Sequence, residues 1–188
     1  MSMQGWVELL AVAPTDGPTL TNTVTATSVL VATAKPVLPA QYFDKPGKMI
    51  RILAKGRIST VVTTPGTFTF DVRFGTTVVF TGGALGLNVT AQTNASFDLD
   101  ISLVCRSIGS ATAATVLGMG NFSSRAVIGS PASTAGGAGE LLLPEITAVV
   151  GTGFDSTVVQ TIDVFGTWSV ASASNSITLH QVMIESLN

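Results

Sequence analysis

Apolar and polar residues alternate with a period of two along most of this 188-residue chain. In residues 67–74, the clearest case, every second residue is apolar: Phe68, Phe70, Val72 and Phe74. Successive side chains of a β-strand point to opposite faces, so this pattern predicts a strand with one face in a core. Helical periodicity is nearly absent. The chain is therefore expected to be all-β.

Seven further strands are predicted, at 24–34, 49–62, 76–81, 96–106, 114–122, 157–171 and 176–187. The turn residues 63–66 predict a hairpin between 49–62 and 67–74, and residues 172–175 predict a second, C-terminal hairpin. Gly118 and Gly120 indicate a bulge or the close approach of another backbone. About eight antiparallel strands without helices predict a two-sheet jelly-roll β-sandwich.

One domain is expected, since β-sandwiches often reach this length as single units. Residues 1–23 are predicted to form an extended N-terminal arm, and residues 24–188 the jelly-roll domain. A long Ala/Gly/Ser-rich loop, 123–156, contains Leu141, Leu142 and Leu143. Loops of this length are uncommon in compact domains, so the three leucines either dock on a neighbouring subunit or pin the loop to their own sandwich.

Charged residues make up only 11% of the chain, against about 25% in ordinary soluble domains. With 46% hydrophobic residues and a mean hydropathy of +0.52, the surface is expected to be covered by other protein. The net charge of −2 offers no basic footprint for phosphates. Direct binding of nucleic acid is therefore not expected.

The few charges are unevenly distributed. Residues 1–106 hold eight basic and six acidic residues, a net +2, whereas residues 107–188 hold one basic and five acidic residues, a net −4. Two readings remain open. Either the two halves present complementary patches across an interface, or their charges mix and cancel within one sandwich.

Cys105 is the single cysteine and falls on the apolar side of its predicted strand. An internal disulfide is thereby excluded, and folding in a reducing cytoplasm is expected. The N-terminal residues do not resemble a secretory signal, and no run of about 18 apolar residues exists for a transmembrane helix. A membrane partner is not expected.

Catalysis needs convergent ionisable groups, but the chain has one histidine, His180, and no nucleophile or nucleotide-binding motif around it. No enzyme activity, metal site or cofactor is predicted. Asp98 and Asp100 share one strand face, where they either supply oxygen ligands to calcium or pair with cations of a neighbouring strand, namely Arg51, Lys55 and Arg57. Trp168 is expected in the core or at a subunit interface.

The C-terminal segments are more specific: residues 153–157 (GFDST), 160–164 (QTIDV), Trp168 and 172–181 (SASNSITLHQ). They resemble virion proteins of tailed bacteriophages that carry a small jelly roll related in shape to the tumour-necrosis-factor and C1q trimers. The resemblance covers about residues 48–188 and implies a structural role without catalytic residues.

What the resemblance implies is a homotrimeric head decoration, or cement, protein on the capsid surface of the virion, with the major capsid protein as partner. The residues expected in capsid or subunit contacts are Trp6, Leu9, Leu10, Leu141, Leu142, Leu143 and Trp168. A receptor-binding or carbohydrate-binding module of a spike or tail is the alternative. A jelly-roll coat protein is a third reading, which the absence of a basic arm disfavours.

Overall fold

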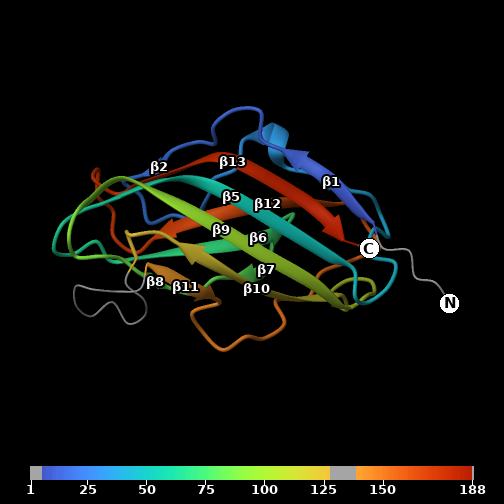
Figure 1. Ribbon diagram of the computed structural model, residues 1–188. Coiled ribbons are helices and arrows are strands. Elements are labelled where there is room, and N and C mark those ends of the chain that lie inside the picture. The colour runs from blue at the N-terminus through green and yellow to red at the C-terminus, as the bar shows by residue number, and fades with distance from the viewer. Residues whose placement is uncertain (1–5, 128–138, 188) are drawn as a thin grey trace.

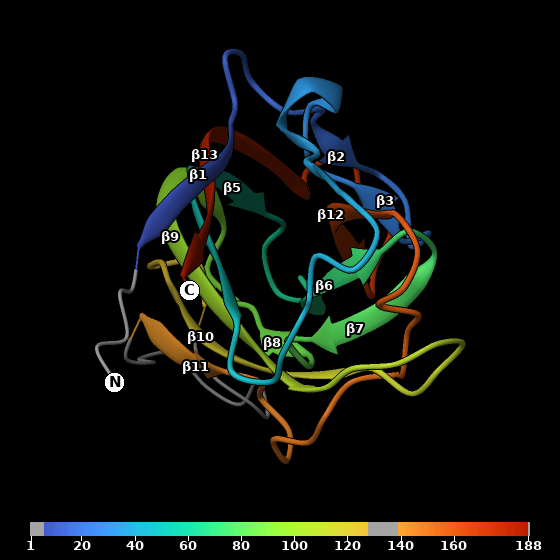
Figure 2. The ribbon, with the colours of Figure 1, turned by 90° about the vertical axis from the view of Figure 1, so that its right-hand side faces the viewer.

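The computed structural model describes residues 6–127 and 139–187. In this part of the chain two antiparallel sheets pack face to face (Figures 1 and 2). The seven-stranded sheet has the order β1-β13-β5-β9-β10-β11, and β2 pairs with β13 off this path. The six-stranded sheet has the order β3-β12-β6-β7, with β4 paired to β12 and β8 to β6. The predicted all-β, jelly-roll-like sandwich is confirmed.

The strands of the seven-stranded sheet are β1 (Val7–Val12), β2 (Leu20–Thr21), β5 (Met49–Thr60), β9 (Gln92–Ser107), β10 (Thr115–Ser123), β11 (Glu140–Leu143) and β13 (Ser176–Leu187). Those of the six-stranded sheet are β3 (Thr27–Ser28), β4 (Val37–Leu38), β6 (Thr67–Phe74), β7 (Thr77–Thr81), β8 (Leu85–Gly86) and β12 (Gln160–Trp168). A single 3₁₀ turn, η1, spans Ala32–Ala34 among the described residues.

Aromatic side chains from both sheets fill the core. The alternation in β6 buries every second residue, as predicted, and places Phe70 of one sheet 5.4 Å, centroid to centroid, from Phe122 of the other. Phe68 packs edge-on against Trp168 at 4.6 Å. Because each ring buries a large apolar area, this cluster supplies much of the driving force that holds the two sheets together.

Two glycines of β10 let other groups approach closely, as the sequence indicated. Gly118 faces the core beneath the ring of Phe80, and a Cβ atom at this position would overlap that ring. Gly120 lies against the backbone of Asp100 in β9. A larger residue at either position would force neighbouring elements apart.

Both predicted hairpins are wrong. β5 pairs with β9 and β13, whereas β6, the next strand along the chain, pairs with β12 and β7 in the other sheet. β12 and β13 are likewise divided between the two sheets. The turn residues specify a chain reversal at 63–66 and 172–175. A reversal of this kind can join two strands of one sheet, but it can also carry the chain from one sheet to the other.

The predicted strand at 24–34 is reduced to β3, followed by η1. Val29 and Leu30 are consecutive and both buried, at 1% and 3% exposure. A strand with a single buried face cannot bury two neighbouring side chains, so the chain leaves the extended conformation here.

The predicted N-terminal arm, 1–23, is also revised, because its described part belongs to the domain. β1 pairs with β13 as an edge strand, and the backbone N–H groups of Ala13 and Gly17 donate to the carbonyls of Val182 and Leu179 at 3.0 and 2.8 Å. Without this segment the outer edge of β13 would lack backbone partners. Residues 1–5 lie outside the described part of the chain.

Candidate interaction surface

The outer face of the seven-stranded sheet carries charged and apolar side chains that do not contribute to the core. In β5 the even-numbered residues are buried, so Met49, Arg51, Leu53, Lys55 and Arg57 point outward. The same alternation in β9 turns Asp98 and Asp100 outward. The outer face is thus built from the polar half of the period-two pattern, interrupted by a few apolar residues.

Ion pairs link β5 to β9 across this face. Lys55 lies opposite Asp98 in the register and pairs with it, and Arg51 donates from Nε and Nη2 to the two carboxylate oxygens of Asp100 at 3.1 and 2.5 Å. The hydrogen bond to Asp100 raises the pKa of Arg51. The sequence left the adjacency of these strands open. The structure pairs the carboxylates with cations, each pair being worth at most about 1 kcal/mol at such exposed positions.

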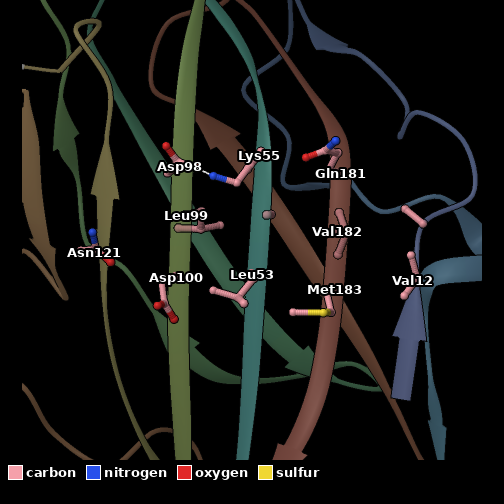
Figure 3. Close-up of a pocket in the computed structure, with 12 residues that line it drawn as sticks. Val12, Leu53, Lys55, Asp98, Leu99, Asp100, Asn121, Gln181, Val182 and Met183 are labelled. Atoms are coloured by element: carbon pink, nitrogen blue, oxygen red, sulfur yellow. Dashed lines mark hydrogen bonds and ion pairs between the residues drawn. The ribbon is translucent and has the colours of Figure 1, made fainter. Parts of the chain in front are cut away.

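A groove of about 710 Å³ crosses this face between β1 and β10 (Figure 3). Val12, Leu53 and Met183 are among the apolar residues that line it, and Met183 extends toward β5. The polar residues that line it are Lys55, Asp98, Asp100, Asn121 and Gln181. Among the described residues, no aromatic side chain contributes to the groove.

At one end of the same face the register aligns apolar residues from six chain segments. This apolar row consists of Val7, Leu187, Met49, Val104, Leu117 and Val150. Val7 and Val150 are 62% and 48% exposed, and the other four are half-buried. Two residues further along these strands, Leu9 and Met119 are 59% and 54% exposed at the two ends of a row whose middle is polar, with Glu185, Arg51 and Ser102. The apolar row itself is typical of an interface.

The predicted contact residues of the N-terminal segment divide between surface and core. Trp6 and Leu9 are exposed, whereas Leu10 is half-buried and packs against the core. The bulge between Leu9 and Ala11 in the pairing with β13 breaks the alternation of β1. Trp6 and Leu9 are thus available to a partner.

The three leucines of the predicted loop 123–156 also differ in exposure, because they belong to a strand, β11. β11 pairs with β10 and places Leu141 and Leu143 in the core, at 8% and 1% exposure. Leu142 points outward and is 74% exposed. Leu141 and Leu143 therefore pin this segment to their own sandwich, and only Leu142 remains a candidate contact. Residues 128–138 of this loop lie outside the described part of the chain.

Trp168 is not a contact residue. Its side chain is 1% exposed, packs on Phe68, and donates its indole N–H to the carbonyl of Leu20 at 3.3 Å. The alternation of apolar residues along a strand does not distinguish a core position from an interface position. The structure places Trp168 in the core of one subunit, where Leu20 of the opposite, seven-stranded sheet accepts its hydrogen bond.

The ionisable groups do not converge on a catalytic arrangement in the described residues. His180 sits at a bulge of β13 and its Nδ1 lies 2.9 Å from Asp16 on the surface. No group of three or more histidine, cysteine or acidic side chains in the described part of the chain is arranged to hold a metal ion. Burial raises the pKa of the Cys105 thiol, which contacts the carbonyl of Ser107. No helix among the described residues is long and apolar enough to cross a membrane.

Comparison of the sequence with protein-family models and with curated proteins finds no match. Among solved structures, the chain is similar to the CBM2 module of Lactobacillus casei BL23 phage J-1 evolved Dit. The TM-score is 0.41 and the identity is 9%, over 99% of this chain and 98% of that chain. At this level of similarity nothing about function is carried over, so a function has to be inferred from the surface of the chain itself.

Proposed function

We propose that this chain is a structural subunit of a tailed-bacteriophage particle: a head decoration protein that forms a homotrimer and binds the shell made by the major capsid protein. The observation that carries the proposal is the apolar row on the outer face of the seven-stranded sheet. The similarity of residues 153–181 to phage jelly rolls supports the assignment to a virion.

Burial of the apolar row explains why the chain can dispense with charge. A monomer would expose Val7 and Val150, at 62% and 48%, together with the half-buried members of the row on a single face. Transfer of apolar surface out of water stabilises an assembly by about 25 cal/mol per Å² before the cost of association. In a closed ring every copy hides the same face.

In this proposal Trp6 contacts the shell. It is 61% exposed, immediately precedes the edge strand β1, and has a side chain of the type enriched in binding hot spots. Trp6→Ser is therefore expected to lower binding to particles that lack the protein while leaving the subunit mass in solution unchanged.

The self-association is tested by light scattering coupled to size exclusion. The expected mass is three times the 19.2 kDa chain mass. Val7→Asp places a charge in the apolar row and is expected to dissociate the assembly. Val37→Asp is the matched control, because Val37 is equally exposed, at 63% against 62%, but lies in the six-stranded sheet. A monomeric wild-type chain, or equal effects of both variants, contradicts the proposal.

A second function, a receptor-binding or carbohydrate-binding module, is favoured by the groove. Carboxylate, amide and ammonium groups of Asp98, Asn121, Gln181 and Lys55 surround its apolar part, and such groups suit a ligand rich in hydroxyls. The two functions differ in copy number. Many copies over the head support decoration, whereas a few copies at the tail together with measurable glycan binding support the module.

A further inference from the structure

A second hollow, of about 470 Å³, lies beside the groove on the outer face of the seven-stranded sheet. It shares Lys55, Asp98 and Gln181 with the groove, and these three residues are labelled in Figure 3. Its apolar lining is small, because Phe97 is 2% exposed and Gly56 has no side chain. The polar lining consists of Lys55 and Arg57 of β5, Ser96 and Asp98 of β9, and His180 and Gln181 of β13. The hollow therefore suits a small polar ligand.

A β-bulge brings His180 into this hollow. The register between β13 and β5 shifts between Leu179 and Gln181, so His180 is the extra residue. His180 and Gln181 are consecutive and both exposed, whereas a regular strand would turn one of them toward the core. The Nδ1 atom of His180 lies 2.9 Å from Asp16, which orients the ring. The bulge thus adds an oriented imidazole to the hollow, as bulges beside binding sites commonly do.

Arg57 presents a free hydrogen-bonding edge. Its Nη1 donates to Ser96 Oγ at 2.7 Å and to the carbonyl of Asn94 at 3.1 Å, which orients the guanidinium. In the described part of the chain no carboxylate pairs with Arg57, and its Nε and Nη2 have no acceptor. Arg51 uses these same two atoms to hold both oxygens of Asp100. The free edge of Arg57 is therefore suited to a carboxylate or a phosphate.

The charges around the hollow leave Arg57 without a counter-ion. Asp98 is the one carboxylate in the described lining, and it is already paired with Lys55. Asp16 pairs with His180 and does not line the hollow. With Asp16 counted, two cations and two carboxylates give a balance of zero while His180 is neutral and of +1 when it is protonated. An anion can thus bind at Arg57 without displacing an existing ion pair.

We propose that this hollow binds an acidic saccharide, whose carboxylate or phosphate group is held by the free edge of Arg57 and by the protonated ring of His180. The amide of Gln181 and the hydroxyl of Ser96 offer donors and acceptors to the sugar hydroxyls. The site depends neither on self-association nor on the apolar part of the groove. It therefore goes beyond the decoration function, and for the receptor-binding alternative it names an anionic class of glycan.

Binding of simple sugars to the whole chain tests the site. Glucuronate and glucose 6-phosphate are titrated into the ¹⁵N-labelled protein, and the chemical shifts of the backbone amides are followed. Glucose is the matched neutral sugar. Both acidic sugars are expected to give saturable shifts at the residues of the hollow, and glucose to bind at least about tenfold more weakly. The two acidic sugars separate a preference for carboxylate from one for phosphate.

Substitutions locate the binding. Arg57→Gln is expected to weaken binding of both acidic sugars about tenfold, and Arg57→Lys, which keeps the charge without the two-atom edge, to have an intermediate effect. Arg106→Gln is the matched control, because Arg106 is an exposed arginine outside the hollow. Asn121→Ala alters the groove alone and should leave binding unchanged. A loss in either control equal to that of Arg57→Gln overturns the site.

The pH dependence tests the part assigned to His180. A ring that donates from Nδ1 to Asp16 can donate from Nε2 only when it is protonated, so glucuronate should bind more tightly at about pH 5.5 than at about pH 8. The other charged groups near the ring, namely Asp16, Lys55, Arg57 and Asp98, are of types that do not ordinarily titrate in this range. His180→Gln should remove the difference. An equal pH dependence in this variant overturns the role of His180.

The remaining outcomes separate this site from the proposed function. If neither acidic sugar binds, the saccharide site is overturned, whereas the trimer mass and the binding to particles are measured without sugar and still decide the decoration proposal. If Arg57→Gln then lowers binding to particles that lack the protein, the hollow receives an acidic group of the shell instead. Equal binding of glucose and the acidic sugars overturns the anionic class of ligand.

Discussion

Asn175 is a buried polar residue at one end of the sandwich. Replacing it tests how the two chain crossings at that end are held together. The residue is fully buried, with 0% exposure, in the connection between β12 and β13. Its Oδ1 accepts from the backbone N–H of Val61 at 2.9 Å, while Nδ2 donates to the carbonyls of Val170 and Pro65 at 3.2 and 3.4 Å. It thereby ties the β5–β6 crossing to the β12–β13 crossing.

Asn175→Ala removes three hydrogen bonds and leaves one N–H and two carbonyl groups without this partner. At about 1 kcal/mol for each bond, the free energy of unfolding should fall by about 3 kcal/mol. For a chain of this length that loss corresponds to a decrease in Tm of about 6–12 °C. Urea unfolding, followed by tryptophan fluorescence, measures the change.

Two conditions make the experiment decisive. Protein concentration must be held constant, because self-association stabilises the folded chain in a concentration-dependent way. Asn121→Ala is the control, since the amide of Asn121 makes a single, exposed hydrogen bond to Glu140 at 3.3 Å and should cost less than about 0.5 kcal/mol. If Asn175→Ala costs no more than this control, the three bonds do not hold the two crossings together.

Two further predictions concern other parts of the fold. Gly118→Ala should lower the free energy of unfolding by about 1–3 kcal/mol, because the new methyl group meets the Phe80 ring. Adding Phe80→Leu should restore part of this loss. If the effects of the two substitutions on the free energy of unfolding in urea are simply additive, the contact between them is contradicted. The pKa of Asp155 is lowered by the Thr157 hydroxyl and by the backbone N–H groups of Ala111 and Thr157. Its stabilisation is therefore complete above the ordinary pKa of aspartate and is lost as pH falls through the lowered value, so Asp155→Asn should reduce the acid dependence of stability below about pH 4. If the stability of Asp155→Asn falls with pH as steeply as that of the wild type, the stabilising role of the Asp155 carboxylate is refuted.

The sequence was sufficient for strands whose burial follows from local geometry. The alternation in 67–74 and 96–106 predicted β6 and the central part of β9, and Phe68, Phe70, Phe97 and Cys105 lie in the core as their positions require. The pairing of Asp98 and Asp100 with β5 cations followed from the same pattern once the strands were adjacent. In these cases one side chain's direction depends only on its place in its own strand.

Strand partners could not be predicted in this way. A turn such as 63–66 or 172–175 reverses the chain whether the next strand joins the same sheet or the opposite one. The choice depends on which pairing buries the aromatic face of β6 against β9 and β10. That is a property of the whole core, and it explains why both predicted hairpins are wrong.

For the candidate interaction surface, too, some features followed from the sequence and others only from the tertiary structure. The shortage of charge and the exposure of apolar residues somewhere on the molecule followed from composition alone. Their alignment into one row did not, because Val7, Met49, Val104, Leu117, Val150 and Leu187 come from six segments that only the register brings together.

By itself, therefore, the sequence determined that this protein is a β-sandwich with a charge-poor surface, because the period-two alternation and the composition are local and additive. Tertiary structure decided which strands are neighbours, turned the predicted arm into an edge strand, and separated Leu142 from Leu141 and Leu143. Those outcomes depend on contacts between residues far apart in the chain, which a linear pattern does not encode.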